Sequence, residues 1–184
     1  NKLFTRLNEK LAENDIHLSL QCVGGFVLEY HGLKATEDID AFYESTAKVE
    51  EIIAEIGQEF HVGTANEPWL SHSIGRIMSL SDEDKVLIFK ASHLEIYLSS
   101  LQSVLIDKIQ VGRAKDIPDI AQIMKKLNIE RPDTLLDLLN SYSEGTSDPA
   151  VVLEAYGLAY GQEALKNYLK ENPDLGILYL YKGN

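Results

Sequence analysis

The stretch from Val23 to Glu44, VGGFVLEYHGLKATEDIDAFYE, places the strongest limits on the fold of this chain. The glycine pair Gly24-Gly25 directly follows the apolar segment Leu18–Val23, which predicts a buried strand. A helix-like segment, Phe26 to His31, comes next, and Asp38-Ile39-Asp40 lies inside a second predicted strand. This order of elements puts the glycines and the aspartates at the same end of neighbouring strands. We therefore expect an α/β (α+β) protein built around the two motifs.

Asp38 and Asp40 form a candidate metal-binding pair. Residues two apart on a strand point to the same face and lie roughly 6–7 Å apart. Ile39 and Phe42 are then expected to turn toward the core. Two carboxylates this close repel each other unless a cation lies between them, and carboxylate oxygens suit Mg²⁺ or Mn²⁺. The alternative is an ordinary solvated strand face.

The glycine pair is a candidate phosphate-binding element. Gly24-Gly25 would let the backbone come close to a ligand and would present N–H groups where the helix begins. Nearby, Lys34 could meet a phosphate, and the Thr36 hydroxyl could orient a carboxylate or contact a nucleotide. Each has a plainer alternative: the glycines form only a turn, Lys34 is a solvated loop residue, and Thr36 is a strand former. Carboxylates beside a phosphate cradle suggest phosphoryl or nucleotidyl transfer.

A second set of charged residues lies later in the chain. Lys108 falls on the apolar stripe of a helix predicted to begin near Leu101. A lysine that faces inward needs an anion, either an aspartate or a nucleotide phosphate, and the alternative is that it extends to solvent. Asp116 is predicted to cap the next helix, and Asp119 is predicted to bond Arg113 or Lys108.

These motifs carry a family resemblance. Gly24-Gly25, followed after twelve residues by Asp38-Ile39-Asp40 with Thr36 just before it, resembles the signature of the DNA polymerase β-like nucleotidyltransferase superfamily. Within that superfamily the chain is most similar to small bacterial nucleotidyltransferase-like proteins, including the toxins of type IV abortive-infection systems. Those proteins pair the first motif with a later lysine and an Arg-x-x-Asp-x-x-Asp segment, here Lys108 and Arg113–Asp119. The resemblance covers roughly two thirds of the chain.

The resemblance implies a metal-dependent nucleotidyltransferase that moves a nucleoside monophosphate from an NTP to an acceptor. It implies Mg²⁺ (or Mn²⁺) on Asp38 and Asp40, with Glu95 as the third carboxylate; the alternative for Glu95 is an exposed strand residue. The residues it implies at the nucleotide and its phosphates are Gly24, Gly25, Lys34, Thr36, Lys108 and Arg113. The implied acceptor is an RNA such as tRNA, or a protein side chain, and the toxin members imply a cognate antitoxin.

Two other functions fit the same residues. A catalytically degenerate binding or regulatory module would keep the nucleotidyltransferase fold without its chemistry. The open question of the third carboxylate and the scarcity of arginine, four in all, favour this alternative. A structural α/β domain that binds neither metal nor NTP is the third alternative.

Composition limits the function classes further. A net charge of −12 argues against a broad basic surface for long nucleic acid, although it allows a local basic pocket. No apolar run approaches the length of about 18 residues that a transmembrane helix needs, and no signal segment is evident. The expected location is therefore cytoplasmic, without membrane association. The single cysteine, Cys22, excludes an intrachain disulfide and a cysteine-based zinc site, and it is expected to be buried and inert.

The expected organisation is a nucleotidyltransferase-fold core over residues 1–99 and a C-terminal helical region over residues 100–184 packed on that core. The core is expected to hold a small mixed sheet flanked by helices. The last strand pair is predicted at Val86–Phe89 and Leu94–Leu98, joined as a hairpin. The apolar segment Leu175–Tyr181 must pack on the body, on a second copy in a homodimer, or on another partner.

The segment between the two halves of the predicted sheet is the least regular. Pro68-Trp69-Leu70 is predicted to begin a short helix, with Trp69 in the core. His72 and Arg76 are four apart, so a helix there would place both on one face, where they could reach a substrate.

Overall fold

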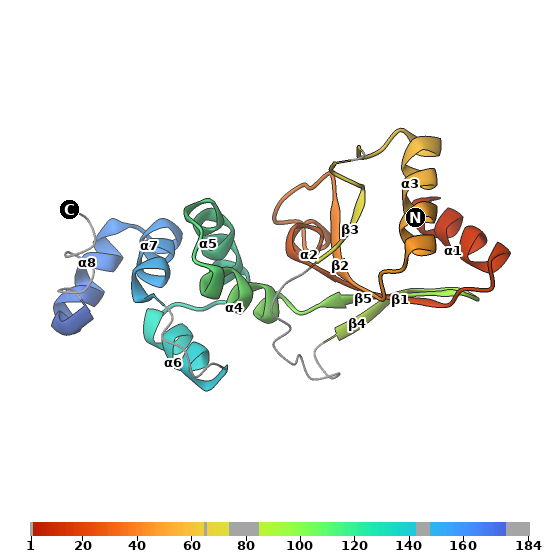
Figure 1. Ribbon diagram of the computed structural model, residues 1–184. Helices are drawn as coiled ribbons and strands as arrows, with labels where there is room; N and C mark the ends of the chain where they lie inside the picture. The colour runs from red at the N-terminus through yellow and green to blue at the C-terminus, as the bar shows by residue number, and fades with distance from the viewer. Residues whose placement is uncertain (1, 65, 74–84, 143–147, 176–184) are drawn as a thin grey trace. The chain divides into compact units, whose positions relative to one another are not determined.

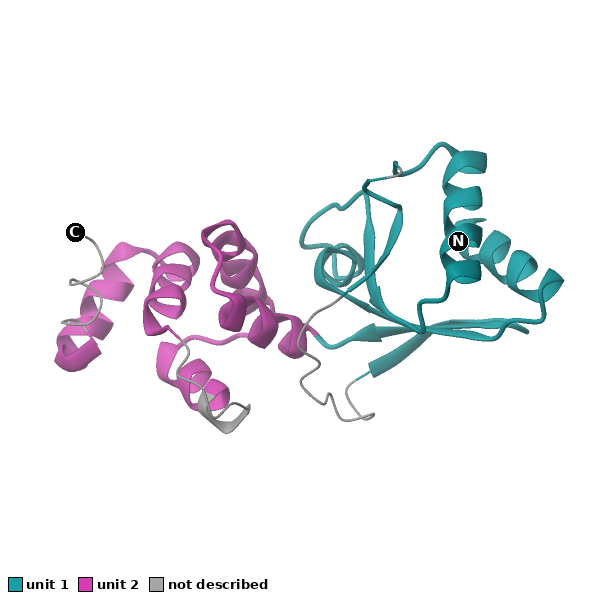
Figure 2. Ribbon diagram, viewed as in Figure 1, with its two compact units in different colours: residues 1–100 teal, residues 101–184 magenta. Residues whose placement is uncertain are grey.

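The structure is a computed structural model that describes residues 2–64, 66–73, 85–142 and 148–175. The chain divides into two compact units, Asn1–Ser100 and Leu101–Asn184 (Figure 2). The first unit is a five-stranded mixed sheet with helices, and the second is helical (Figure 1). The fold class is therefore the expected α/β one.

The described elements of the first unit are helices and strands that alternate as far as the third strand and are followed by two more strands. In chain order they are α1 (Lys2–Glu13), β1 (Leu18–Val23), α2 (Gly24–Tyr30), β2 (Ile39–Phe42), α3 (Ala47–Phe60), β3 (Leu70–His72), β4 (Lys85–Lys90) and β5 (Leu94–Ser99). The sheet order is β3-β2-β1-β5-β4. β1 is antiparallel to β2 and parallel to β5, β2 is parallel to β3, and β4 is antiparallel to β5. The predicted strand at Leu18–Val23 and the predicted hairpin of β4 and β5 are both confirmed.

The sheet has one apolar face and one polar face, because side chains alternate along each strand. On the apolar face, Leu20 pairs with Ile96, and Cys22 lies between Ala41 and Leu98. All five are buried. The polar face carries Ser19, Gln21, Val23, Asp40, Ser71, Glu95 and Tyr97.

Helices α1 and α3 pack against each other on one side of the sheet (Figure 1). Each is amphipathic, and their buried residues are Phe4, Leu7, Leu11, Val49, Ile52, Ile53 and Ile56. Two ion pairs join the solvent-facing sides of these helices, Arg6 with Glu59 and Lys10 with Glu55. The Thr46 hydroxyl caps α3 by accepting a hydrogen bond from the Val49 N–H.

Three expectations about local structure need correction. The helix after β1 begins at Gly24 rather than Phe26, because the glycine pair itself forms its first turn. Phe42 is half-buried on the polar face, and Ala41 takes the core position beside Ile39. No helix begins at Pro68: Leu70–His72 is strand β3, because it gains a hydrogen-bonded neighbour in β2.

Trp69 is in the core, as expected. Its side chain is 2% exposed, and its indole N–H donates a hydrogen bond to the carbonyl of Ile53 on α3. The Trp69 carbonyl accepts a hydrogen bond from the Ile39 N–H, which sets the start of β2 against β3. Trp69 thus ties the edge of the sheet to the helix that covers it.

The second unit holds five α-helices among its described residues: α4 (Leu101–Val111), α5 (Ile117–Lys126), α6 (Pro132–Tyr142), α7 (Pro149–Tyr160) and α8 (Gln162–Glu171). A short 3₁₀ turn, η2 (Ala114–Asp116), joins α4 to α5. Helix α7 contacts α5, α6 and α8 and is buried on most of its circumference. It is therefore the core of this unit. No helix in the described ranges is both long and apolar enough to cross a membrane.

Candidate active site

The glycine pair and the aspartate motif meet at one end of β1. Val23, the last residue of β1, pairs with Asp40 of β2 in the antiparallel register. Gly24 follows with φ +59°, a left-handed conformation that favours glycine. A Cβ atom on Gly24 would lie 3.3 Å from Asp40 Oδ2, so the Gly24 backbone lies directly against this carboxylate.

Gly25 makes the second contact between the two motifs. A Cβ atom there would lie only 2.9 Å from the Thr36 hydroxyl oxygen, closer than real Cβ atoms come to such a neighbour. Any larger residue would push Thr36 away. The glycines are therefore required by close packing against the segment that carries the aspartates.

Asp40 is held by the neighbouring strand. It pairs in register with Ser71 of β3, and the Ser71 hydroxyl donates a hydrogen bond of 2.7 Å to Asp40 Oδ1. Asp40 is half-buried. Ser71 was not a candidate from the sequence, because its segment carried a helix prediction and gave no motif of its own.

Asp38 lies outside the strand that was predicted for it. β2 begins at Ile39, and Asp38 is exposed in the bend before it. The Thr36 hydroxyl donates a 2.7 Å hydrogen bond to Asp38 Oδ1, and the Thr36 N–H donates one of 3.3 Å to Glu29 Oε2 on α2. Thr36 thus orients this carboxylate, which was one of the two roles considered for it.

The two carboxylates receive hydroxyl hydrogen bonds and no countercharge from the described part of the chain. Within the described ranges, neither Asp38 nor Asp40 has an ion-pair partner, and the Oδ2 atom of each accepts no hydrogen bond. Both groups are carboxylates, which offer hard oxygen ligands. Two such groups without a countercharge among the described residues suit a divalent cation such as Mg²⁺ or Mn²⁺.

Glu95 lies elsewhere on the sheet. It pairs with Ser19 near the start of β1, whereas Asp40 pairs with Val23, four residues or about 13 Å further along that strand. Its carboxylate binds Lys90 Nζ at 2.6 Å and the Tyr97 hydroxyl at 2.9 Å. The hydrogen bonds from Lys90 and then Tyr97 lower the pKa of Glu95. The structure therefore does not bring Glu95 to the two aspartates.

Lys108 belongs to a buried charge cluster in the helical unit. Its ammonium donates hydrogen bonds to Asp116 at 2.7 Å and to Asp119 at 2.9 Å, and all three residues are buried. The Arg113 side chain donates a further 2.6 Å hydrogen bond to Asp116. Burial raises the pKa of Asp116, but the hydrogen bonds from Arg113 and Lys108 outweigh it, so the pKa lies below its ordinary value. The Asp116 side chain makes no capping hydrogen bond, because it is used in this cluster.

The remaining candidates lie as follows. Lys34 is exposed in the loop before β2. His72 is exposed at the end of β3, with its ring edge against Tyr43. Arg76 lies outside the described residues, as does the tail from residue 176 onward. Cys22 is fully buried, and burial raises its thiol pKa to about 12, so it is inert at neutral pH, as expected.

Comparison with known families gives a match over most of the chain. A family model described as "nucleotidyltransferase of unknown function (DUF6036)" matches residues 1–148, which include the described site and the Lys108 cluster. No curated protein and no solved structure matches the chain.

Proposed function

We infer that this chain, which belongs to that nucleotidyltransferase family, is a metal-dependent enzyme that moves a nucleoside monophosphate from an NTP to an RNA or protein acceptor. One observation carries the proposal. The glycine pair is in contact with both the Asp40 carboxylate and the Thr36–Asp38 segment, although twelve residues separate the two motifs. A phosphate-binding backbone beside two carboxylates that have no countercharge among the described residues suits a metal-bound nucleotide. The polymerase β-type mechanism is part of this proposal.

In this proposal Asp38 and Asp40 hold one or two Mg²⁺ or Mn²⁺ ions through their Oδ2 atoms. Bound there, the metal would lower the pKa of an attacking hydroxyl and neutralise charge on the transferring phosphate. Thr36 and Ser71 orient the carboxylates by occupying their Oδ1 atoms, which leaves the second oxygens to face the ion. Ser71 is thus a positioning residue in this scheme.

The nucleotide is proposed to lie along the glycine pair. The backbone of Gly24 and Gly25 would bind the triphosphate, because neither residue has a side chain and Gly24 lies directly against the Asp40 carboxylate. Lys34, exposed in the loop that leads to β2, would add a positive charge for the phosphates. Thr36 would serve the metal through Asp38 rather than contact the base.

Three residues receive other roles in this proposal. Glu95 is proposed to stabilise the β4–β5 pair through Lys90, because it lies about 13 Å along the sheet from the level of Asp40. Lys108 is proposed to be structural, because its ammonium already serves two buried carboxylates. Arg113 is proposed to support the same cluster through Asp116.

The acceptor is proposed to be an RNA end, such as that of tRNA, or a protein side chain. The net charge of −12 disfavours a long nucleic acid held along a broad surface, so a short contact at the site suits this chain better. By its resemblance, the chain is further proposed to be a toxin neutralised by a cognate antitoxin. A catalytically degenerate binding module is the second candidate, favoured by a metal-binding pair that lacks Glu95 as its third carboxylate.

The test is transfer of label from each radiolabelled NTP to total cellular RNA or protein in the presence of Mg²⁺ or Mn²⁺. The wild type is compared with Asp38→Asn/Asp40→Asn, which keeps the shape of both side chains and removes their charge. The matched control is Glu37→Gln/Glu44→Gln, which removes two exposed charges that flank the same segment. We expect transfer by the wild type and the control and none by the aspartate variant.

NTP binding measured in parallel separates the two candidates. Metal-dependent NTP binding without transfer to either acceptor pool would favour the binding module. Equal transfer by the aspartate variant and the wild type would reject the proposed site. Neither binding nor transfer by the wild type would reject the nucleotidyltransferase proposal for this chain.

A further inference from the structure

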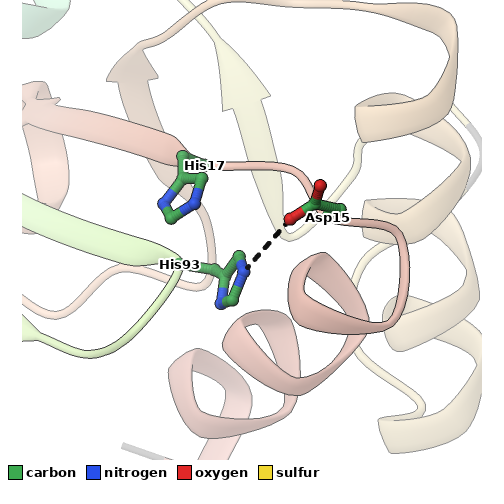
Figure 3. Close-up of side chains that lie close together, drawn as sticks. All are labelled: Asp15, His17 and His93. Carbon is green, nitrogen blue, oxygen red and sulfur yellow. Dashed lines mark ion pairs between the residues drawn. The ribbon is translucent and has the colours of Figure 1, made fainter.

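Three metal-ligating side chains gather at the opposite end of β1 from the candidate active site. Asp15 lies in the turn after α1, His17 comes directly before β1, and His93 lies in the turn between β4 and β5. One ligand atom from each side chain lies within 4.8 Å of the other two. Figure 3 shows a nitrogen of each imidazole on the side toward the Asp15 carboxylate. The fold therefore brings together residues that are 78 positions apart in the sequence.

The two imidazole rings are already arranged beside the carboxylate. They stack with centroids 4.3 Å apart, and His93 Nε2 lies 3.9 Å from Asp15 Oδ1. His93 Nδ1 lies 3.0 Å from the Ser92 hydroxyl, and the His93 backbone N–H donates a hydrogen bond to Asn8 Oδ1. A metal-ligating histidine commonly makes a hydrogen bond through its other ring nitrogen. The contact of Nδ1 with Ser92 would therefore orient the ring and leave Nε2 for the ion.

Only small side-chain movements separate this arrangement from a bound ion. Tetrahedral zinc with bonds of about 2.0–2.1 Å needs ligand atoms about 3.3 Å apart. The Asp15 side chain is 98% exposed and that of His93 is 20% exposed, so Asp15 can close by rotation while His93 stays in place. A surface pocket lined by His17, Ser19, Lys90, Ser92 and His93 gives an ion access from solvent.

We propose that Asp15, His17 and His93 form a binding site for a zinc-class divalent transition metal. Two imidazoles and one carboxylate are ligands that suit Zn²⁺ or Co²⁺, whereas Mg²⁺ prefers oxygen atoms alone. Three protein ligands leave one position of a tetrahedral ion for water or an added ligand.

This site is separate from the Asp38–Asp40 pair and does not rest on the proposed function. His17 precedes Val23 by six residues of extended chain, or about 20 Å, and Val23 pairs with Asp40. An ion here would join the α1–β1 turn, the start of β1 and the β4–β5 turn. The expected consequence is stabilisation of the first unit on metal binding.

The experiment uses the full chain without any histidine tag. Zn²⁺ binding is measured by calorimetry and by the rise in melting temperature, and Co²⁺ binding by its visible absorption, which reports nitrogen and oxygen ligands in a tetrahedral site. We expect one ion per chain with micromolar affinity or better, not displaced by excess Mg²⁺. His17→Gln, His93→Gln and Asp15→Asn should each weaken binding by at least ~10-fold.

Matched variants keep the outcome decisive. Asp15→Asn removes a ligand charge at an exposed residue whose φ of +53° asparagine tolerates, so it tests binding without disturbing the packing. His61→Asn changes an exposed histidine in the left-handed conformation after α3, and it should bind as the wild type does. Binding that survives all three ligand substitutions, or a wild type that binds no stoichiometric ion, would overturn the proposal.

Discussion

Each unit of the molecule holds a pair of neighbouring aspartates, and the two pairs differ in their burial and in how their charge is compensated. In the helical unit, Asp116 and Asp119 are buried, and Lys108 and Arg113 neutralise them at 2.6–2.9 Å. In the sheet unit, Asp38 is exposed and Asp40 half-buried, and each accepts one hydroxyl hydrogen bond. A buried pair must carry its own cation, because an uncompensated charge in the interior is very costly. A pair of carboxylates at the surface can instead be compensated by a cation from solution.

The comparison predicts that function and stability separate between the two pairs. Changing the sheet pair should remove activity and spare the fold, because solvent already screens its charges. Changing the helical pair should remove stability, because the Lys108 ammonium would be left buried without its carboxylates. The four substitutions below test this separation from the largest expected effect to the smallest.

Asp40→Asn should lower the rate of nucleotidyl transfer by roughly a thousand-fold, since it removes a proposed metal ligand worth several kcal/mol to the transition state. The melting temperature without metal should stay the same or rise, because repulsion from Asp38 is relieved. Label transfer measures the predicted loss of activity, and thermal unfolding with and without Mn²⁺ measures the predicted effect on stability. A variant that loses stability as well as activity would contradict the comparison.

Lys108→Met should destabilise the chain by about 3 kcal/mol, because it removes the ammonium that pairs with both buried carboxylates, Asp116 and Asp119. Urea unfolding measures this loss. Lys115→Met, which removes an exposed lysine next to the cluster, is the matched control and should stay within about 0.5 kcal/mol of the wild type. If Lys108→Met keeps the wild-type stability and loses only activity, Lys108 acts at the phosphates and its structural assignment is wrong.

Ser71→Ala should weaken Mn²⁺ binding by ~10-fold, the low end of the range for residues that orient metal ligands. The Asp40 carboxylate would lose the hydrogen bond that holds its Oδ1 atom. Metal titration followed by thermal stability gives the affinity. Ser73→Ala, two residues further along, should bind as the wild type does, and an equal loss in both variants would remove the special role of Ser71.

Asp116→Asn should destabilise the chain most near neutral pH. The folded pKa of Asp116 is lowered, so its stabilising contribution is present above the unfolded pKa of about 3.9 and is lost as the pH falls through the folded value. The difference in unfolding free energy between wild type and variant should therefore shrink from about pH 6 to about pH 3. Urea unfolding at several pH values measures it, and a difference that grows on acidification would contradict the sign.

Local patterns in the sequence predicted several elements of the first unit. The strand at Leu18–Val23 and the β4–β5 hairpin each follow from a short run of residues, because the apolar pattern of such a run reports the buried side of a single strand. The spacing of apolar residues likewise predicted Lys108 on the buried stripe of its helix. In the structure Lys108 is buried there and donates a hydrogen bond to Asp119. Trp69 was likewise expected in the core, and it is buried there.

Long-range pairing was beyond the reach of those patterns. Strand β3 has three residues and forms only because β2 offers it hydrogen bonds, so its own sequence predicted a helix start instead. Ser71 reaches Asp40 through that pairing. The family resemblance implied Glu95 as a third carboxylate beside the aspartates, yet the parallel register of β1 and β5 places it beside Ser19.

The sequence by itself determined that a glycine pair and two aspartates would meet at one end of adjacent strands, because a strand, a short helix and a returning strand leave few other paths. Only the tertiary structure decided which of the described charges are paired within the chain and which are not. In the folded chain Lys108 forms ion pairs with two aspartates, Glu95 pairs with Lys90, and Asp15, His17 and His93 lie together. The reason is that countercharges and metal ligands come from segments far apart in sequence, so their distances are set by strand register and packing.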